Sequence, residues 1–353
     1  MKKIRRFKVI LLLFGSMMFM GCPKEMDEYY KSVATVWKNG EVQKLTNEIN
    51  NTTASFICVS GNNVYLAGME TVKYDDNFPR LWRNGEKQIL SNQRGVTSSV
   101  HVSDNDVYVV GYEWINTTKS VATLWKNGMA QELIDGNISS EGKSVYVSGS
   151  DVYVAGLEYY ESNSIIAKLW KNGVAQNLSG ATFNSGATSV YISGSDVYVA
   201  GYIYNTKYRW IATVWKNGEP QYLSNVDGDY SSFARSVFVS NGDVYVAGYE
   251  NTASGMNVAI LWKNGEAQYL TDGSTKAFAS SVYVSENDVY VVIDEETQHE
   301  DIGKLPWRNG KLWKNGEIQN FSNGIYETSV SSVYVSGNDV YVAGSILERE
   351  CCR

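Results

Sequence analysis

From residue 33 onward, hydrophobic and polar positions alternate in short runs that end in turn-forming residues. Val and Tyr alternate from Val145 to Val147 and again from Val152 to Val154, with a polar run at residues 148–151 between them. A period of two predicts β-strands, and the polar run predicts a tight turn that joins them. Because bulky apolar side chains point to both faces, such a sheet must be covered on both sides.

One unit carries this pattern and recurs seven times along the chain. It reads Ser-Val-Tyr-Val-Ser-Gly-x-Asp-Val-Tyr-Val-Ala-Gly, then a variable stretch, then Ala-Thr-Leu-Trp-Lys-Asn-Gly-x-x-Gln-x-Leu. Each unit predicts four strands, A to D, and its Asn-Gly pair predicts a type I′ hairpin between C and D. The strand C tryptophans lie 43 to 51 residues apart, a spacing typical of four-stranded propeller blades. They are Trp37, Trp82, Trp125, Trp170, Trp215, Trp262 and Trp313.

We therefore predict an all-β fold, a seven-bladed β-propeller of four-stranded antiparallel blades. Radially stacked blades cover each other's apolar faces, whereas a β-helix does not suit antiparallel hairpins and a β-sandwich does not need seven equal units. The repeats open on strands C and D around Trp37 and end on strands A and B around Tyr341. With strand A innermost, the N- and C-terminal strands share one blade and close the ring. The alternative starts every blade at the Trp strand and gives seven contiguous blades.

The first 21 residues differ in composition from the rest. Five basic residues precede an apolar run, Val9 to Met20, that is too short to span a bilayer comfortably, since a membrane helix needs roughly 20 residues. The run ends in Phe-Met-Gly-Cys22, which resembles a bacterial lipobox. The resemblance implies that residues 1–21 are removed and that a lipid on Cys22 holds the protein to a membrane. An ordinary signal peptide with a chance cysteine is the alternative.

This interpretation divides the chain into a lipoprotein signal peptide (1–21), a lipid-anchored linker (22–32), the propeller (33–345) and a C-terminal tail (346–353). It predicts a location in a bacterial cell envelope, with the outer membrane or the surface favoured over the inner membrane. Removing residues 1–21 takes away five of the 31 basic residues and none of the 38 acidic ones, which leaves a formal charge of −12. Nucleic acid is therefore not expected as a partner, because affinity for phosphates rests on Lys and Arg.

The strand B sequence Val-Tyr-Val-Ala-Gly resembles the second strand of kelch repeats and of the SBBP-type repeats of bacterial propellers. The resemblance covers residues 33–345. Kelch blades carry Gly-Gly where this chain has Ala-Gly, so the chain departs from kelch repeats proper. The resemblance implies an architecture and no activity.

The antiparallel order places the A–B and C–D turns on one face of the disc and the longer, more variable connections on the other. Function on a rigid scaffold concentrates in such loops. Their aromatic rings beside acidic residues suit sugars or peptide side chains. The candidate ligand-binding residues are Tyr74, Asp75, Trp114, Tyr159, Tyr160, Tyr204, Tyr208 and Trp210. Packing of any one ring onto the blade tops is the alternative.

Acidic residues recur at two positions of the repeat. Glutamates just after strand B predict either a partial acidic ring on the variable face or solvated loop starts. They are Glu70, Glu113, Glu158, Glu250 and Glu295. Aspartates in the A–B turns serve turn formation. In the longest insert, residues 307–310 look like a stray copy of the C–D turn.

The sequence offers little for catalysis. The two histidines are His101, in a strand A position, and His299, in the longest insert. No nucleophile-elbow, metal-binding or phosphate-loop pattern occurs, so we expect no catalytic residue, metal or cofactor and no enzyme activity. Cys58 takes a strand position and is predicted to be a small buried apolar group. Cys351 and Cys352 lie in the tail.

We therefore expect a cell-envelope lipoprotein that binds a glycan, peptide or protein ligand through its variable loop face. The aromatic and acidic residues of those loops carry this expectation. A structural scaffold for other envelope proteins is the alternative. A glycoside hydrolase, which would use two carboxylates, is less favoured.

Overall fold

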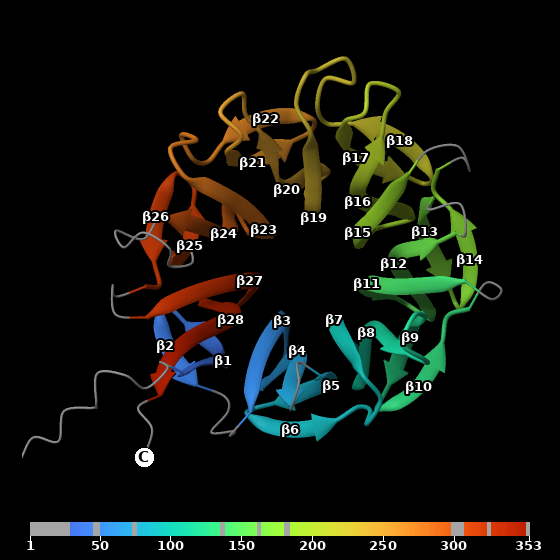
Figure 1. Ribbon diagram of the computed structural model, residues 1–353, viewed down its shortest axis with the longest axis vertical. Helices are drawn as coiled ribbons and strands as arrows, with labels where there is room; N and C mark the ends of the chain where they lie inside the picture. The colour runs from blue at the N-terminus through green and yellow to red at the C-terminus, as the bar shows by residue number, and fades with distance from the viewer. Residues whose placement is uncertain are drawn as a thin grey trace, which may run out of the picture.

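The computed structural model confirms the predicted fold class. It describes residues 29–44, 50–72, 76–134, 138–160, 164–179, 184–297, 307–322 and 326–350. These residues form seven four-stranded antiparallel sheets, arranged as the blades of a propeller around a central axis (Figure 1). Among them, no helix is long and apolar enough to cross a membrane.

Six blades are continuous in sequence, each written here from its strand A to its strand D. The first three are β3 (Asn51–Ser60), β4 (Asn63–Val72), β5 (Asp76–Arg83) and β6 (Glu86–Ile89); β7 (Gly95–Ser103), β8 (Asp106–Trp114), β9 (Ser120–Lys126) and β10 (Met129–Glu132); and β11 (Ser139–Ser148), β12 (Asp151–Tyr159), β13 (Ile165–Lys171) and β14 (Val174–Asn177). The next three are β15 (Ser185–Ser193), β16 (Asp196–Tyr204), β17 (Trp210–Lys216) and β18 (Glu219–Tyr222); β19 (Ser232–Ser240), β20 (Asp243–Asn251), β21 (Asn257–Lys263) and β22 (Glu266–Tyr269); and β23 (Lys276–Ser285), β24 (Asp288–Thr297), β25 (Trp307–Lys314) and β26 (Glu317–Asn320).

The seventh blade joins the two ends of the chain. Its order is β27 (Glu327–Ser336), β28 (Asp339–Glu350), β1 (Tyr29–Lys38) and β2 (Glu41–Lys44). Ten antiparallel residue pairs connect β1 to β28. The A strands lie innermost and contact one another around the ring. Both parts of the prediction, strand A innermost and closure by the terminal strands, are confirmed.

The Asn-Gly pairs form the predicted hairpin turns. Asn127 and Gly128, between β9 and β10, have φ values of 50° and 84°. A type I′ turn requires this left-handed conformation at both central residues, and Asn and Gly adopt it most readily. The other six Asn-Gly pairs between strands C and D also have positive φ values at both residues.

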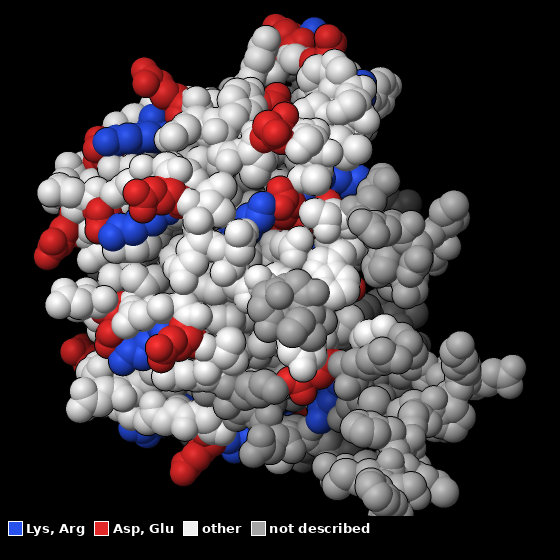
Figure 2. All heavy atoms as spheres, turned by 90° about the vertical axis from the view of Figure 1, so that its left-hand side faces the viewer, with Lys and Arg blue, Asp and Glu red and all other residues white. Residues whose placement is uncertain are grey.

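Each turn asparagine also links the C–D turn to the A–B turn of its own blade. Asn127 Oδ1 accepts a hydrogen bond of 2.9 Å from Val107 N–H, and Asn127 Nδ2 donates one of 2.8 Å to Asp106. Lys126 forms an ion pair of 2.7 Å with the same carboxylate. The asparagine link recurs in every blade, with Asn63 in place of the aspartate in one. Seen edge-on, basic and acidic side chains lie together along this short-turn face, on the left of Figure 2.

Apolar side chains fill the interfaces between blades, as expected for sheets that carry apolar side chains on both faces. Trp125 of β9 packs against Cys58, Leu81 and Leu90 of the preceding blade. Cys58 is buried, as predicted, and burial raises the pKa of its thiol to about 11. The thiol therefore stays protonated at neutral pH and serves as an apolar filler.

Hydroxyl groups at the start of strand A join neighbouring blades. Ser140 Oγ of β11 accepts a hydrogen bond of 2.9 Å from Ala122 N–H of β9 in the preceding blade. The same contact is made by Thr52, Ser185, Ser232 and Thr328. At the boundary between β5 and β7, both the donor and the acceptor of this hydrogen bond are replaced. Pro79 of β5 has no N–H, and Gly95 of β7 has no hydroxyl. A Cβ on Gly95 would lie 3.1 Å from the Pro79 ring, so the two residues also fit each other in space.

Strands B and C run farther toward the variable face than the sequence indicated. Residues 307–310, which were expected in the connection between strands B and C, are the first residues of β25, and Asn309 pairs with Glu295 of β24. That placement was wrong because backbone pairing with β24 continues through Thr297, which gives Asn309 and Gly310 strand positions. Their origin as a stray copy of the C–D turn sequence stays a prediction.

Candidate functional site

The variable face has a hollow at the mouth of the central channel, which we call the mouth pocket. Its volume is about 630 Å³. Residues near the beginning of strand A and the end of strand B line it, and they come from five of the seven blades. Among the lining residues are Tyr202, Phe233, Arg235, Tyr249 and Asp294. Aromatic and charged side chains therefore converge in one concave surface, as in many ligand sites.

Strand pairing and a β-bulge aim these side chains at the mouth. Phe233 of β19 lies opposite Tyr249 of β20 in the antiparallel register. The register then shifts between Ala234 and Ser236, which leaves Arg235 without a partner in the ladder. Such bulges redirect a side chain. Every blade has this shift in strand A, and the bulged residues are Ser55, Ser98, Lys143, Thr188, Arg235, Ser280 and Ser331.

A row of aromatic rings leads into the mouth pocket. Tyr204 contacts Trp210 with ring centroids 4.7 Å apart, and Trp210 contacts Tyr202 at 5.0 Å. Tyr202 meets Phe233 edge-on at 5.3 Å, and Phe233 stacks on Tyr249 at 4.9 Å. These five residues form what we call the aromatic row. Their separations fall in the range of favourable ring pairs, so the rings hold one another in place.

Arg235 extends the aromatic row with a positive charge. Its guanidinium lies over the rings of Tyr249 and Phe278, at 5.1 and 5.6 Å from their centroids. The side chain is exposed, and no ion pair with a described carboxylate accompanies it. Lys143, at the same bulge position in another blade, pairs instead with Glu141 at 2.6 Å. Arg235 thus presents a charge that the described residues leave uncompensated.

Asp294 lies on another part of the pocket wall. Its Oδ2 accepts a hydrogen bond of 2.8 Å from Ser329 and lies 3.7 Å from an Arg308 nitrogen. Its Oδ1 is buried and has no hydrogen-bond partner among the described residues. Burial raises the pKa of Asp294, against the lowering effects of Ser329 and Arg308. The carboxyl group is therefore held in the pocket wall by Ser329 and Arg308, and its Oδ1 is out of reach of a molecule in the pocket.

The structure places the predicted site residues in three different settings. Trp114 packs edge-on against Tyr112 at 6.2 Å, and Tyr159 and Tyr160 donate hydrogen bonds of 3.1 Å to glutamates. Tyr204 and Trp210 belong to the aromatic row, while Tyr208 is 74% exposed beside Tyr204. The structure thus brings together only the last three of these residues. Tyr74, Asp75, Cys22, His299, Cys351 and Cys352 lie outside the described residues.

Phe233, Arg235, Tyr249 and Asp294 were not predicted from the sequence. The predicted site lay in the loops, whereas these residues belong to the strands β19, β20 and β24. Arg235 carried a signal, since it replaces the Ser or Thr that most blades have at the bulge. Its importance becomes visible only when the bulge is known, because a regular strand would point it elsewhere.

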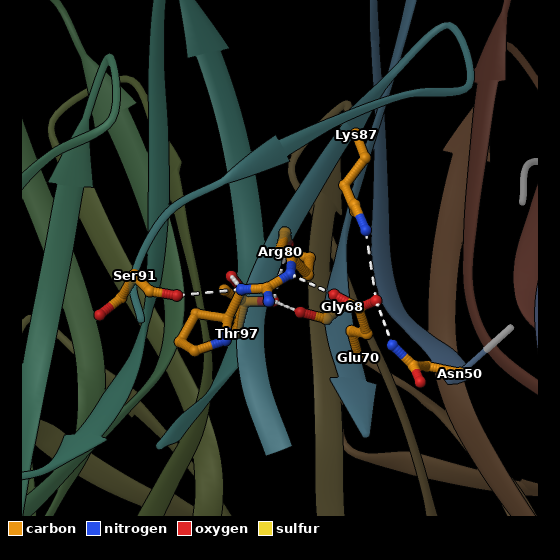
Figure 3. Close-up of polar contacts among 8 residues, drawn as sticks. Asn50, Gly68, Glu70, Arg80, Lys87, Ser91 and Thr97 are labelled. Atoms are coloured by element: carbon orange, nitrogen blue, oxygen red, sulfur yellow. Dashed lines mark hydrogen bonds and ion pairs between the residues drawn. The ribbon is translucent and has the colours of Figure 1, made fainter. Parts of the chain in front are cut away.

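The recurrent glutamates do not form an acidic ring. Glu70 forms ion pairs with Arg80 at 2.7 Å and Lys87 at 3.2 Å, and it accepts a hydrogen bond from Asn50 (Figure 3). Burial alone would raise the pKa of Glu70, but the hydrogen bonds from Asn50, Arg80 and Lys87 outweigh it and lower the pKa to about 2. Arg80 is held further by the Ser91 carbonyl oxygen at 2.9 Å.

Two further glutamates of this set are neutralised within their own blades. Glu158 pairs with Lys168, and both side chains are buried. Glu295 pairs with Lys311. The cation stands on strand C next to the glutamate on strand B in each case. These carboxylates therefore balance charges inside the blade instead of attracting cations from solution.

Below the mouth pocket, aromatic side chains narrow the channel. His101, Tyr146, Tyr191, Phe238, Tyr283 and Tyr334 form a chain of ring contacts with centroid separations of 4.6 to 4.9 Å. Cys58 takes the seventh position of the same belt. The cavity at this level has a volume of only about 160 Å³. Burial lowers the pKa of His101 to about 4, so its imidazole is neutral at pH 7.

The protein is a seven-bladed propeller, and N- and C-terminal strands together form the blade that closes its ring. The sequence matches no protein-family model and no curated protein. Similar solved structures are a Mycobacterium tuberculosis puromycin-hydrolyzing peptidase (11% identity, TM-score 0.46, covering 79% of this chain and 56% of that one), a Pyrococcus horikoshii acylaminoacyl peptidase (13%, 0.39, 85% and 58%) and the β-propeller domain of the Trilobed protease from Pyrococcus furiosus (13%, 0.39, 77% and 98%). This chain thus spans little more than half the length of the first two.

These similarities correct one expectation. The sequence analysis predicted that the protein is not an enzyme, and as an exclusion that prediction is wrong. Propellers with this general fold occur in peptidases, so the fold excludes no enzymatic role. At such low identity the similarity concerns the fold alone. Within the described ranges, no group of three or more His, Cys, Asp or Glu side chains is placed to hold a metal ion.

Proposed function

We propose that the protein binds a glycan, peptide or protein ligand in the mouth pocket on its variable face. One observation carries the proposal: aromatic and charged side chains from separate blades line a single hollow of about 630 Å³. Aromatic rings supply apolar contact area, and a few fixed polar groups orient a ligand. The closed ring and the contacts within the aromatic row hold these groups in place before a ligand arrives.

The test replaces rings of the pocket while keeping apolar volume. The purified protein and its Tyr202→Leu and Tyr249→Leu variants are screened against an array of glycans and peptides. Loss of an interface aromatic typically weakens binding by roughly 10-fold or more. The matched control is Tyr222→Leu, an exposed tyrosine on the outer strand β18. An array with no ligand, or ligands whose binding both pocket variants retain, would contradict the proposal.

A scaffold role would give a different result. In that case the protein recovers stable envelope partners in fixed stoichiometry, and the Tyr202→Leu and Tyr249→Leu variants recover them equally well. Binding that depends on the mouth pocket separates the two functions, because a scaffold contact on the rim or the short-turn face does not involve these rings.

We further propose that the protein is a bacterial lipoprotein anchored to the cell envelope through Cys22. The basic and apolar run before Phe-Met-Gly-Cys22 supports this proposal. Its kelch-like or SBBP-type repeat origin is proposed on the strand B motif alone. In the native cell, Cys22→Ser is expected to abolish incorporation of labelled fatty acid and to move the protein from the detergent phase to the aqueous phase. Unchanged partitioning would argue against lipidation.

A further inference from the structure

The positive charge at the mouth pocket suggests a class of ligand. The chain after residue 21 has a formal charge of −12, so an anion is repelled at long range and needs a local cation. Arg235 supplies one: it is exposed at the pocket, and its guanidinium is oriented by Tyr249 and Phe278. A guanidinium presents a planar fork of N–H donors that matches a carboxylate.

Two hydroxyl groups of the pocket are engaged with main-chain carbonyl oxygens. The Thr188 hydroxyl lies 3.0 and 2.9 Å from the carbonyl oxygens of Ala200 and Ala234, and its one proton is donated to one of them or shared between them. The Ser331 hydroxyl donates to Ala54 and Ala343 in the same way. These two hydroxyl oxygens keep lone pairs for a ligand, whereas Arg308, which also lines the pocket, pairs with Glu296 at 3.2 Å.

A ligand rich in hydroxyl donors satisfies such acceptors best. A saccharide presents several hydroxyls per ring, whereas a peptide main chain presents one N–H per residue. The faces of sugar rings also pack well on aromatic rings such as Tyr202 and Tyr249. The acceptors and the rings therefore favour a saccharide, and Arg235 favours one that carries a carboxylate.

We propose that the mouth pocket recognises an acidic saccharide, a glycan that contains a uronic or sialic acid, and that Arg235 binds its carboxylate. The proposal rests on the proposed function and specifies its ligand. In this arrangement the sugar ring lies against Tyr202 and Tyr249, and the sugar hydroxyls donate to Thr188 and Ser331.

The experiment uses matched acidic and neutral probes. Oligogalacturonides and sialyllactose are compared with their methyl esters, which keep the sugar and remove the negative charge. At least one acid is expected to bind, and esterification is expected to weaken its binding roughly 10- to 100-fold, the effect of losing one hydrogen bond between charged groups. Arg235→Gln is expected to weaken binding of the acid by a similar factor and to leave binding of the ester nearly unchanged.

The control is Arg83→Gln, which removes an arginine that lies over Tyr65 on the opposite, short-turn face. This variant should bind like the wild type. Equal binding of acid and ester, an Arg235→Gln variant that binds the acid normally, or a preference for sulfated glycans without carboxylates would overturn the proposal. Pocket-dependent binding of neutral glycans or peptides only would also overturn it while the proposed function stands. An array without any pocket-dependent ligand would overturn both.

Discussion

At the scale of single residues, burial decides what the ionisable groups can do. His101 lies in the channel belt with its ring 4.6 Å from Tyr146, in a position that other blades fill with Tyr, Phe or Cys. Its pKa falls to about 4 because burial penalises the charged imidazole. The belt therefore tolerates a histidine only in its neutral form.

This lowered pKa makes stability depend on pH. The unfolded chain binds a proton on His101 near pH 6.5, whereas the folded chain does so only near pH 4, so folding stability falls as the pH decreases between these values. The loss should approach about 3 kcal/mol below pH 4. In His101→Phe this part of the loss should disappear, as urea denaturation at pH 7 and pH 4.5 would reveal. Wild-type and variant curves that fall in parallel with pH would rule the mechanism out.

At the scale of elements, a charged pair on strands B and C of one blade is replaced by two uncharged residues in the next blade. Glu158 of β12 and Lys168 of β13 form a buried ion pair, and Glu158 Oε1 has no hydrogen-bond partner among the described residues. The next blade carries Ile203 and Thr213 at the equivalent positions. Buried pairs of this kind are often no more stabilising than apolar side chains of similar size, although breaking one is costly.

The uncharged pair of the neighbouring blade can be introduced in place of Glu158 and Lys168. Lys168→Thr alone leaves the Glu158 carboxylate buried without its cation and should destabilise the fold by about 3–5 kcal/mol. Glu158→Ile combined with Lys168→Thr copies the neighbouring blade and should restore most of that loss. Urea midpoints of both variants and the wild type test this expectation. A double variant as unstable as the single one would show that the pair contributes more than charge balance.

The sequence was sufficient for the elements but not for the site. The repeated Trp and Asn-Gly positions predict the blades and their hairpins, because both depend on local pattern and period. Closure of the ring was predicted from the resemblance of Val-Tyr-Val-Ala-Gly to the second strand of a blade. The mouth pocket depends on a one-residue register shift that exposes Arg235 and on long-range pairing that sets Phe233 against Tyr249. Arg235 stands out from the Ser or Thr of most other blades, but the register shift and the pairing leave no local pattern in the sequence. Tyr204, Tyr208 and Trp210 could therefore be predicted, and the pocket they lead to could not.

At the scale of the whole molecule, one strand holds the ring closed. β1 pairs with β28 along its full length, while its side chains reach both neighbouring blades. Val36 packs with residues of the following blade, and Trp37 packs with Tyr290 and Leu312 of the preceding one. The loss of β1 therefore removes two blade interfaces and leaves the edge of β28 unpaired.

A chain that begins at residue 50 tests this role. It lacks β1 and β2, and the loss of Trp37 alone should cost about 3–5 kcal/mol. We expect a lower melting temperature and association of the exposed β28 edges, visible as larger species in size-exclusion chromatography. A synthetic peptide of residues 29–44 should bind the edge and return the protein to a monomer. A shortened chain that is monomeric and as stable as the wild type would refute the closure role.

The paired change at Pro79 and Gly95 has a consequence for how such a ring can evolve. These residues belong to different blades, and Ser140-like hydroxyls elsewhere need the N–H that Pro79 lacks. A duplicated or recombined segment cut at the blade ends would separate the two and leave an acceptor without its donor, or a side chain where only glycine fits. The two residues on either side of a blade boundary must therefore be inherited together. Recombination points that preserve the fold are expected inside a blade and not at its ends.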